Sequence, residues 1–274
     1  MENEIGCALE EIRRKKPLVH HITNYVTANG CANITLAIGA SPVMADELEE
    51  VHDIVSISSA LVLNIGTLNQ RIMESIIAAG KKANSLGIPV VFDPVGAGAS
   101  AYRNRSALRL MEEVKLSVVR GNVSEIGFIA GAGGMAKGVD ASEDDTAAGN
   151  EARSLLAKSA AKILGCVAAI TGPVDVISDG SRTIYIENGT KLLSGVTGTG
   201  CMCTSLIGAY LGAAADYLTA AAGGVLSMGI AGELAEMNAD GKGCGAFQMG
   251  ILDAIGNLNA EEIKRRAKIY EQRD

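Results

Sequence analysis

The stretch LVLNIGTLNQRIMESIIAAGKKANSLGIPVVF, residues 61–92, decides the class of fold. It opens with an apolar run at residues 61–65 and closes with another at 89–92, and both are typical of buried strands. Between them, residues 69–86 carry isoleucines at helical spacing, which predicts an amphipathic helix. Gly87 stands where a helix-terminating glycine belongs. The segment is therefore interpreted as strand, helix and strand, the unit from which parallel sheets are built.

The same alternation extends through the first two-thirds of the chain. Further helices are predicted at residues 106–114 and 151–164, the second one ended by Gly165. The remaining strands are predicted at residues 18–22, 116–120, 166–171, 174–178 and 183–186. We expect a three-layer α/β fold, a mainly parallel central sheet with helices on both faces, in a single domain that spans residues 1–274.

After Gly200 the pattern changes to buried helices made of small apolar residues. These are predicted at residues 201–214, 217–238 and 247–257, with a polar closing helix at 261–272. Residues 192–215 carry no charge, but their glycines and hydroxyl side chains favour a buried loop and helix over a membrane span. Residues 131–145 are predicted to form a surface loop.

Composition excludes several classes of partner. Aromatic residues make up 3% of the chain, tryptophan is absent and the net charge is −7, which argues against nucleic acids and other polyanions. The first residues, MENEIGC, lack the apolar core of a signal peptide, and the six cysteines and three histidines show no zinc-ligand spacing. We expect a cytoplasmic protein with free thiols and without a membrane partner.

In open α/β sheets, ligands bind beyond the carboxyl ends of the strands, so the residues that follow each strand are the candidates. The segment VVFDPVGAG, residues 90–98, places Asp93 at the tip of a strand before a proline. A carboxylate there could hold Mg²⁺, which binds one or two carboxylates together with phosphate oxygens. The alternative is a turn begun by an Asp-Pro pair.

The segment VVRGNVSEI, residues 118–126, places Arg120 at the end of a buried strand. A guanidinium in that position suits a phosphate group. Asn122 and Glu125 have the spacing of a capping box, which needs no further function. The functional alternative places Glu125 near a metal ion or a phosphate-bound water.

Two later segments offer further candidates. In AITGPVDVISDG, residues 169–180, the hydroxyl of Thr171 could contact a nucleotide phosphate or cap a turn. In GVTGTGCMCTS, residues 195–205, a strand is expected to lead into a glycine turn and a helix that starts near Cys201. Free N–H groups at a helix N-terminus bind anions, and the alternative is a turn that packs closely against a small-residue helix. At the helix start the thiol pKa of Cys201 is expected to be lowered.

Taken together and in this order, these segments resemble the hydroxyethylthiazole kinase family of the ribokinase-like superfamily. The resemblance runs from about residue 18 to 256 and includes HITNYVTAN (21–29) and ASPVMA (40–45) beside VFDPVGAGAS, RGNVSEI and VTGTGCMCTS. Other ribokinase-like kinases usually have an aspartate base after the glycine turn, where the thiazole kinases have a cysteine. Cys201 therefore favours the narrower family.

The resemblance implies a ribokinase-like fold and an activity. The hydroxyl group of 5-(2-hydroxyethyl)-4-methylthiazole would be phosphorylated by ATP with Mg²⁺, a step of thiamine biosynthesis and salvage. It also implies a homotrimer with pockets between subunits.

The resemblance further implies roles for particular residues. Arg120 and Thr171 would contact ATP, while Asp93 and Glu125 would serve the metal and the phosphates. The thiazole would contact Met44, Gly198, Asn24 and Val26. The catalytic turn would consist of Gly198, Thr199, Gly200 and Cys201.

Two alternatives stay open. One is another ribokinase-like activity, such as a hydroxymethylpyrimidine kinase or an NAD(P)HX dehydratase, which an aspartate at position 201 would have favoured. The other is a nucleotide-binding regulator that lost catalysis together with the acidic base.

Overall fold

The computed structural model describes residues 1–131 and 147–273, and these contain a nine-stranded sheet. The strand order is β2-β1-β3-β4-β5-β6-β7-β8-β9. The five pairings between neighbours from β2 to β6 are parallel. The remaining three pairings, β6 with β7, β7 with β8 and β8 with β9, are antiparallel. The strands are β1 (Leu18–Ile22), β2 (Ser41–Met44), β3 (Ala60–Asn64), β4 (Val90–Asp93), β5 (Val118–Gly121), β6 (Val167–Ile170), β7 (Asp175–Ser178), β8 (Arg182–Ile186) and β9 (Ile269–Arg273).

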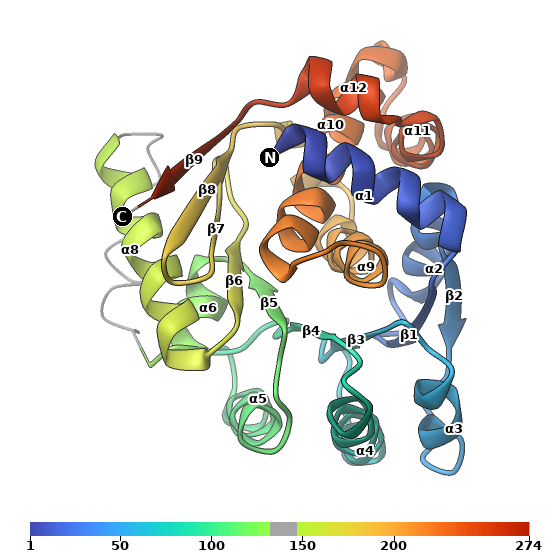
Figure 1. The fold of residues 1–274 in the computed structure, drawn as a ribbon, viewed down its shortest axis with the longest axis vertical. Helices are drawn as coiled ribbons and strands as arrows, with labels where there is room; N and C mark the ends of the chain where they lie inside the picture. Colours follow the sequence, from blue (N-terminus) through green and yellow to red (C-terminus); the bar gives the residue numbers. More distant parts are fainter. Residues whose placement is uncertain (132–146, 274) are drawn as a thin grey trace.

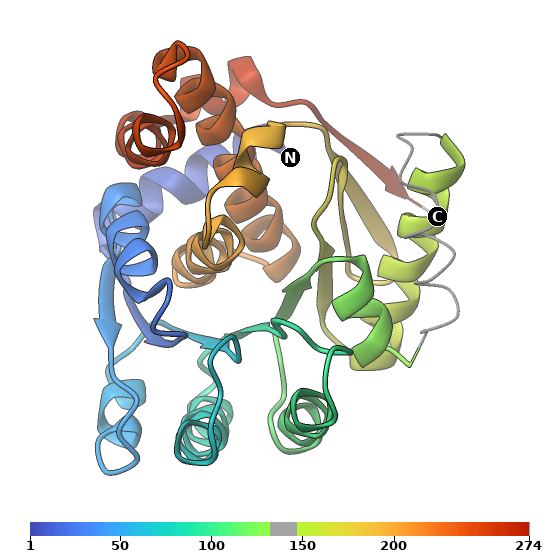
Figure 2. The same ribbon diagram turned by 180° about the vertical axis from the view of Figure 1, so that it is seen from behind.

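Helices cover both faces of this sheet (Figures 1 and 2). One face carries α3 (Val51–Ser56), α4 (Gln70–Leu86), α5 (Ala101–Glu113), α6 (Val123–Ile129) and α8 (Ala147–Leu164). The other carries α1 (Glu2–Lys15), α2 (Ala28–Ile38), α9 (Thr199–Leu211), α10 (Tyr217–Ala239), α11 (Cys244–Asn257) and α12 (Ala260–Arg266). Each face buries its own apolar cluster, so the predicted three-layer α/β fold is confirmed.

The βαβ unit at residues 61–92 forms as its sequence predicts. Asn69 caps α4, because its side chain accepts a hydrogen bond from the Ile72 N–H. Gly87 ends the helix in the left-handed conformation, with φ of 70°. Gly165 follows α8 in the same way, with φ of 64°.

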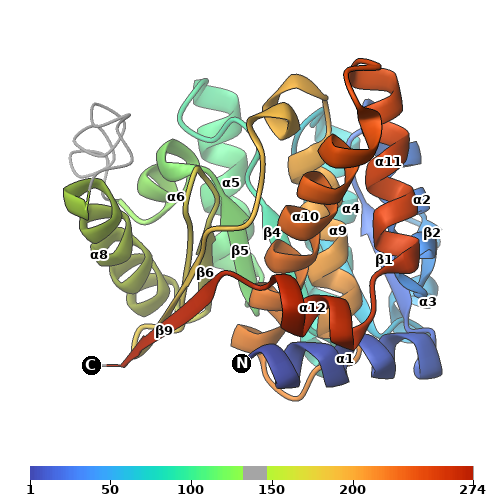
Figure 3. The ribbon, with the colours of Figure 1, turned by 90° about the horizontal axis from the view of Figure 1, so that it is seen from above.

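The N-terminal helix packs against the helix that precedes the last strand, on the same face of the sheet. Helices α1 and α12 lie side by side (Figures 1 and 3), and a Cβ added at Gly6 would stand 3.0 Å from the Cβ of Ala260. Helix α10 is long and apolar enough to cross a membrane, but 89% of its most apolar window is buried inside the domain. It therefore has the environment of a core helix.

Several sequence expectations need correction. The predicted helix over residues 261–272 is wrong in its second half, because α12 ends at Arg266 and the chain continues as β9 along the edge strand β8. The predicted strand before Gly198 is a short 3₁₀ helix, η1 (Lys191–Gly195). β2 was not predicted, and the loop expected at residues 131–145 lies outside the described residues except for Gly131.

Candidate active site

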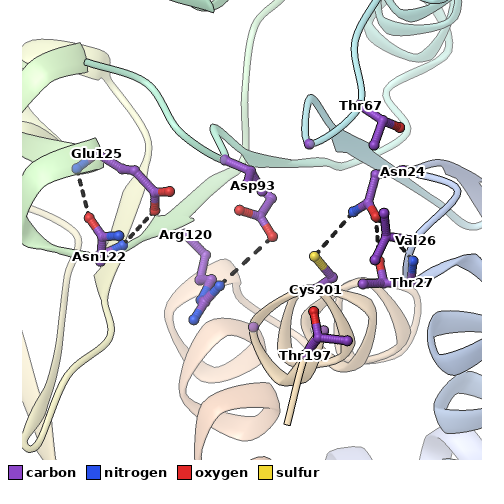
Figure 4. A pocket seen from close by; sticks show the side chains of 14 residues that line it. Asn24, Val26, Thr27, Thr67, Asp93, Arg120, Asn122, Glu125, Thr197 and Cys201 are labelled. Atoms are coloured by element: carbon purple, nitrogen blue, oxygen red, sulfur yellow. Dashed lines mark hydrogen bonds and ion pairs between the residues drawn. The ribbon is translucent and has the colours of Figure 1, made fainter. Parts of the chain in front are cut away.

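A pocket of about 360 Å³ lies at the carboxyl ends of the parallel strands β1, β3, β4 and β5 (Figure 4). Side chains that follow four strands meet the N-terminus of α9 there, as expected for ligand sites of open α/β sheets. The lining residues are Asn24, Val26, Thr27, Gly66, Thr67, Asp93, Val95, Arg120, Asn122, Glu125, Thr197, Gly198, Gly200 and Cys201.

Asp93 is the last residue of β4 and is completely buried. Its Oδ2 accepts hydrogen bonds from Thr204 Oγ1 at 2.8 Å and from Asn64 Nδ2 at 3.1 Å. Its Oδ1 is buried and has no hydrogen-bond partner. Burial raises the pKa of this carboxyl to about 6, although Arg120 favours the charged form. One oxygen of Asp93 is therefore held by two donors, and the other is buried without a hydrogen-bond partner.

Arg120 approaches Asp93 from the neighbouring strand β5. Its Nη1 lies 3.8 Å from Asp93 Oδ2, and its Nη2 donates to Thr171 Oγ1 at 2.5 Å. A Cβ at Gly200 would stand 2.7 Å from Arg120 Nη1, so the guanidinium passes this close to α9 only because residue 200 has no side chain. Thr171 lies behind Arg120 and is not among the pocket-lining residues.

Glu125 forms the capping box that its sequence predicts and also lines the pocket. The capping box is confirmed, since Asn122 Oδ1 accepts from the Glu125 N–H and Glu125 Oε2 accepts from the Asn122 N–H, each at 2.9 Å. Oε1 of the same carboxylate accepts from the Gly96 N–H at 2.8 Å. These bonds hold a carboxylate that lines the pocket at the same end as Asp93 and Arg120 (Figure 4).

Cys201 is the third residue of α9, and its thiol lines the opposite end of the pocket. The Sγ accepts hydrogen bonds from Asn24 Nδ2 and Asn64 Nδ2, both at 3.3 Å. The expectation of a lowered pKa is wrong. Burial raises the thiol pKa, and the nearby Asp93 carboxylate raises it further.

The turn before α9 requires glycine. Gly198 is the N-cap of α9 with φ of 88°, and a Cβ there would stand 2.6 Å from Thr27 Cγ2. Thr199 does not line the pocket, because its Oγ1 donates to the Leu193 carbonyl at 2.8 Å and ties the turn to η1. The first N–H groups of a helix have no partner within the helix, so this turn presents donors to an anion.

The structure thus brings together most of the sequence-predicted site residues. Asn24, Val26, Asp93, Arg120, Glu125, Gly198, Gly200 and Cys201 line the pocket. Met44, at the end of β2, is 40% exposed and lies outside the lining, as do Thr171 and Thr199.

Sequence reasoning missed five polar residues of this site: Thr27, Thr67 and Thr197 line the pocket, and Asn64 and Thr204 donate to Asp93. A signal existed for Asn64, because an asparagine that closes a buried apolar run at the tip of a strand resembles the pattern of Asp93. The two are paired in register on β3 and β4. Thr204 has no such signal, because it lies inside an apolar helix.

The carboxylates of the pocket fit a hard divalent cation together with phosphate oxygens. Among the described residues no group of three or more His, Cys, Asp or Glu side chains could hold a metal by itself. The buried, unpartnered Oδ1 of Asp93 is the oxygen to which a cation would bind. Both oxygens of Glu125 already accept backbone N–H groups, so this residue is suited to binding through a water molecule.

The layered sheet, with a pocket at the carboxyl ends of its parallel strands and the N-terminus of α9 beside it, has the ribokinase-like fold. The pyridoxal kinase of Staphylococcus aureus, solved with ADP, has this fold, with a TM-score of 0.63, 15% identity and coverage of 94% of this chain and 99% of that one. The NAD(P)H-hydrate dehydratase of Bacillus subtilis shares it too, with a TM-score of 0.58, 15% identity and coverage of 89% and 90%.

Sequence comparison identifies one family among the proteins that share this fold. The model of the hydroxyethylthiazole kinase family matches residues 9–261. The hydroxyethylthiazole kinase of Clostridium beijerinckii is 60% identical over 99% of this chain and 100% of its own length. The solved hydroxyethylthiazole kinase of Pyrococcus horikoshii is 38% identical, with a TM-score of 0.88 and 98% of each chain covered. The chain belongs to the hydroxyethylthiazole kinase family, and it is a kinase.

Proposed function

We propose that this chain transfers the γ-phosphoryl group of ATP to the hydroxyl group of 5-(2-hydroxyethyl)-4-methylthiazole. The observation that carries the proposal is the division of the pocket into two ends. Arg120, Asp93 and Glu125 gather at one end, whereas Cys201 and Val26 stand at the other. A charged end suits phosphates, and an end with a neutral thiol and an apolar side chain suits a small uncharged ring.

At the charged end, Arg120 would contact the phosphates of ATP, with Thr171 holding its guanidinium. Asp93 would bind Mg²⁺ through its free Oδ1, and Glu125 would act on the same ion through water. Bound there, Mg²⁺ would neutralise charge on the β- and γ-phosphates. The N–H groups of the turn formed by residues 198–201 would bind the phosphoryl group as it moves.

At the other end, Asn24, Val26 and Gly198 would surround the thiazole, and its hydroxyl would then lie near Cys201, which lines the same part of the pocket. Phosphoryl transfer depends mainly on positioning and on charge neutralisation. The hydroxyl oxygen would bond to the γ-phosphorus as the bond from that phosphorus to the departing ADP oxygen breaks. A neutral thiol is compatible with this step, because the hydroxyl proton would leave late, to a phosphoryl oxygen or to water.

Three wider statements belong to the proposal. The chain would act as one kinase domain in the cytoplasm, in thiamine biosynthesis and salvage. It would form a homotrimer, in which Met44, exposed at the end of the edge strand β2, completes the thiazole site of a neighbouring subunit. Sedimentation of the purified protein tests the trimer, and a Met44→Ala variant tests the substrate contact.

The decisive experiment measures ATP consumption with Mg²⁺ against three acceptors: the hydroxyethylthiazole, hydroxymethylpyrimidine and ribose. We expect turnover with the thiazole, a phosphorylated product by mass spectrometry, and little turnover with the other two. Equal or greater activity on either competitor would favour another ribokinase-like activity. No turnover with any acceptor, together with retained ATP binding, would favour the nucleotide-binding regulator.

A further inference from the structure

Asn64 occupies the centre of the site without belonging to the lining of the pocket. It closes β3, pairs in register with Asp93 on β4 and is 3% exposed. Its side chain makes four hydrogen bonds. Nδ2 donates to Asp93 Oδ2 at 3.1 Å and to Cys201 Sγ at 3.3 Å, while Oδ1 accepts from Asn24 Nδ2 at 3.0 Å and from the Gly66 N–H at 2.8 Å.

The orientation of this amide is decided by its partners. Gly66 offers a backbone N–H, which requires an acceptor, and Asp93 offers a carboxylate oxygen, which requires a donor when it is ionised. Only one placement of the amide satisfies both. The N–H₂ group therefore faces the thiol and the carboxylate, and turning the amide over would break both contacts.

Two consequences follow for the groups that face the ligands. Because Asn64 and Thr204 both donate to Oδ2 of Asp93, the unpartnered oxygen is Oδ1. Because Asn24 and Asn64 both donate to Cys201 Sγ, the sulfur is held at the side of the pocket next to Asp93. One amide thus links the charged end of the pocket to the acceptor end.

We propose that Asn64 is a positioning residue that fixes Asp93 and Cys201 relative to each other, so that the phosphoryl donor and the acceptor hydroxyl meet at reacting distance. The proposal rests on the proposed function, because it takes the donor to bind at Asp93 and the acceptor at Cys201. Asn64 itself acts through these two side chains. Its loss is expected to affect the rate of transfer more than the binding of either substrate.

The test uses Asn64→Leu, which keeps the branched shape of the side chain and removes its donors and its acceptor. It also uses Asn64→Asp, which keeps Oδ1 and replaces the donor with a second carboxyl oxygen. Misplacement of reacting groups by about 1 Å costs about 10²-fold in rate. We expect kcat to fall by about that factor in both variants, with less than about a threefold change in KM for the thiazole. A kcat within about threefold of wild type in either folded variant would overturn the proposal.

Asn188 provides a matched control. It is also 3% exposed and lies in a hydrogen-bond network with Glu233, the Arg266 carbonyl and the Lys268 N–H, outside the pocket. Asn188→Leu should destabilise the fold by a comparable amount, measured as the thermal midpoint, and leave kcat of the folded enzyme unchanged. If it lowers kcat as Asn64→Leu does, the effect at Asn64 is general destabilisation and the proposal fails.

A second readout does not depend on turnover. The rate at which iodoacetamide alkylates Cys201, followed by peptide mass spectrometry, should fall at least about threefold at pH 8 in Asn64→Leu, because the thiolate loses a hydrogen-bond donor. Exposed Cys7 serves as the internal reference. The titratable groups that face Cys201 are Asp93, Cys31 and Cys203, with the charged Arg120 beyond Asp93, and none of them is substituted in this variant.

The two readouts separate the possible failures. Unchanged alkylation of Cys201 would overturn the positioning role whatever the reaction. If alkylation of Cys201 is slower in Asn64→Leu but the wild-type protein does not phosphorylate the thiazole, the proposed function is contradicted. The link between Asn64 and Cys201 would still stand.

Discussion

Arg120 Nη1 stands 3.8 Å from Asp93 Oδ2, although the two side chains are only 13% and 1% exposed. Each lies near the carboxyl end of its strand, one residue beyond the pair Phe92 and Val119 of the β4–β5 ladder. The separation exceeds a hydrogen bond, so the carboxylate does not saturate the guanidinium. Buried charges held apart in this way keep hydrogen-bonding capacity for a third, charged group, which in the proposed reaction is the Mg²⁺-bound triphosphate.

Replacement of Arg120 by alanine is expected to weaken the use of ATP and to spare the thiazole. Loss of a charge-assisted hydrogen bond costs roughly 1.5–3 kcal/mol, which is about 10- to 100-fold in KM or Kd for ATP. Calorimetry with each substrate separately checks the prediction. Unchanged ATP binding together with lost thiazole binding would show that the nucleotide lies elsewhere.

Substitutions of Cys201 distinguish whether this residue acts as a general base or as a neutral thiol that positions the substrate. Because burial and Asp93 raise its pKa, the thiol is protonated at neutral pH. We expect Cys201→Ala to slow kcat by less than the roughly 10²–10⁴-fold that follows removal of a general base.

Cys201→Asp should keep kcat or raise it, because Asn24 and Asn64 already direct N–H groups at this position and would hold a carboxylate. Steady-state kinetics and thermal unfolding are measured on both variants. A fully folded but inactive Asp variant would show that Cys201 packs against the substrate and does not occupy the position of the base.

Gly198→Ala should destabilise the fold and abolish turnover together. A non-glycine residue at φ of 88° costs about 1–3 kcal/mol, and the added Cβ would lie 2.6 Å from Thr27 Cγ2. The control is Gly195→Ala in the same segment, since a Cβ at Gly195 meets nothing within 4 Å. Chemical denaturation and activity assays compare the two variants, and equal behaviour would show that the turn tolerates a side chain.

Asp93 should lower the free energy of unfolding as the pH rises from 4 to 8, which is the opposite of the usual effect of a carboxylate. Its folded pKa, about 6, lies above the unfolded value near 3.9. The folded state therefore binds this proton more tightly, and the resulting contribution to stability is complete below about pH 4 and lost as the pH rises through 6. Asp93→Asn imitates the protonated form, so it should stabilise the fold at pH 8 by up to about 3 kcal/mol and change little at pH 4.

The control for this prediction is a carboxylate whose substitution should change the stability at pH 8 in the opposite direction. Arg182 and neighbouring N–H groups hold the pKa of Asp179 at about 2, so Asp179→Asn should lose stability at pH 8. Urea unfolding at pH 4, 6 and 8 measures both variants. Destabilisation of Asp93→Asn to the same extent at all three pH values would contradict the raised pKa.

Local patterns were sufficient for much of the fold. The apolar runs at the predicted strands and the capping residues Asn69 and Gly87 acted as their local chemistry requires, because a cap or a buried strand is specified within a few residues. The predictions that failed concern segments whose structure depends on tertiary contacts more than on local sequence. β9 forms from a polar segment because the neighbouring strand β8 offers a free edge, and Tyr270 stacks on Tyr185 with ring centroids 4.6 Å apart.

The sequence by itself determined that the strand tips carry Asp93 and Arg120 and that a glycine turn opens a helix at Cys201, since these are local features of short segments. Only the tertiary structure decided how they act together. It buried Asp93 and Cys201 enough to raise both pKa values, left one oxygen of Asp93 free and placed Asn64 between them. The physical reason is that desolvation and hydrogen-bond partnership depend on residues far apart in the chain, here on β3, β4 and α9, and no local pattern encodes that distance.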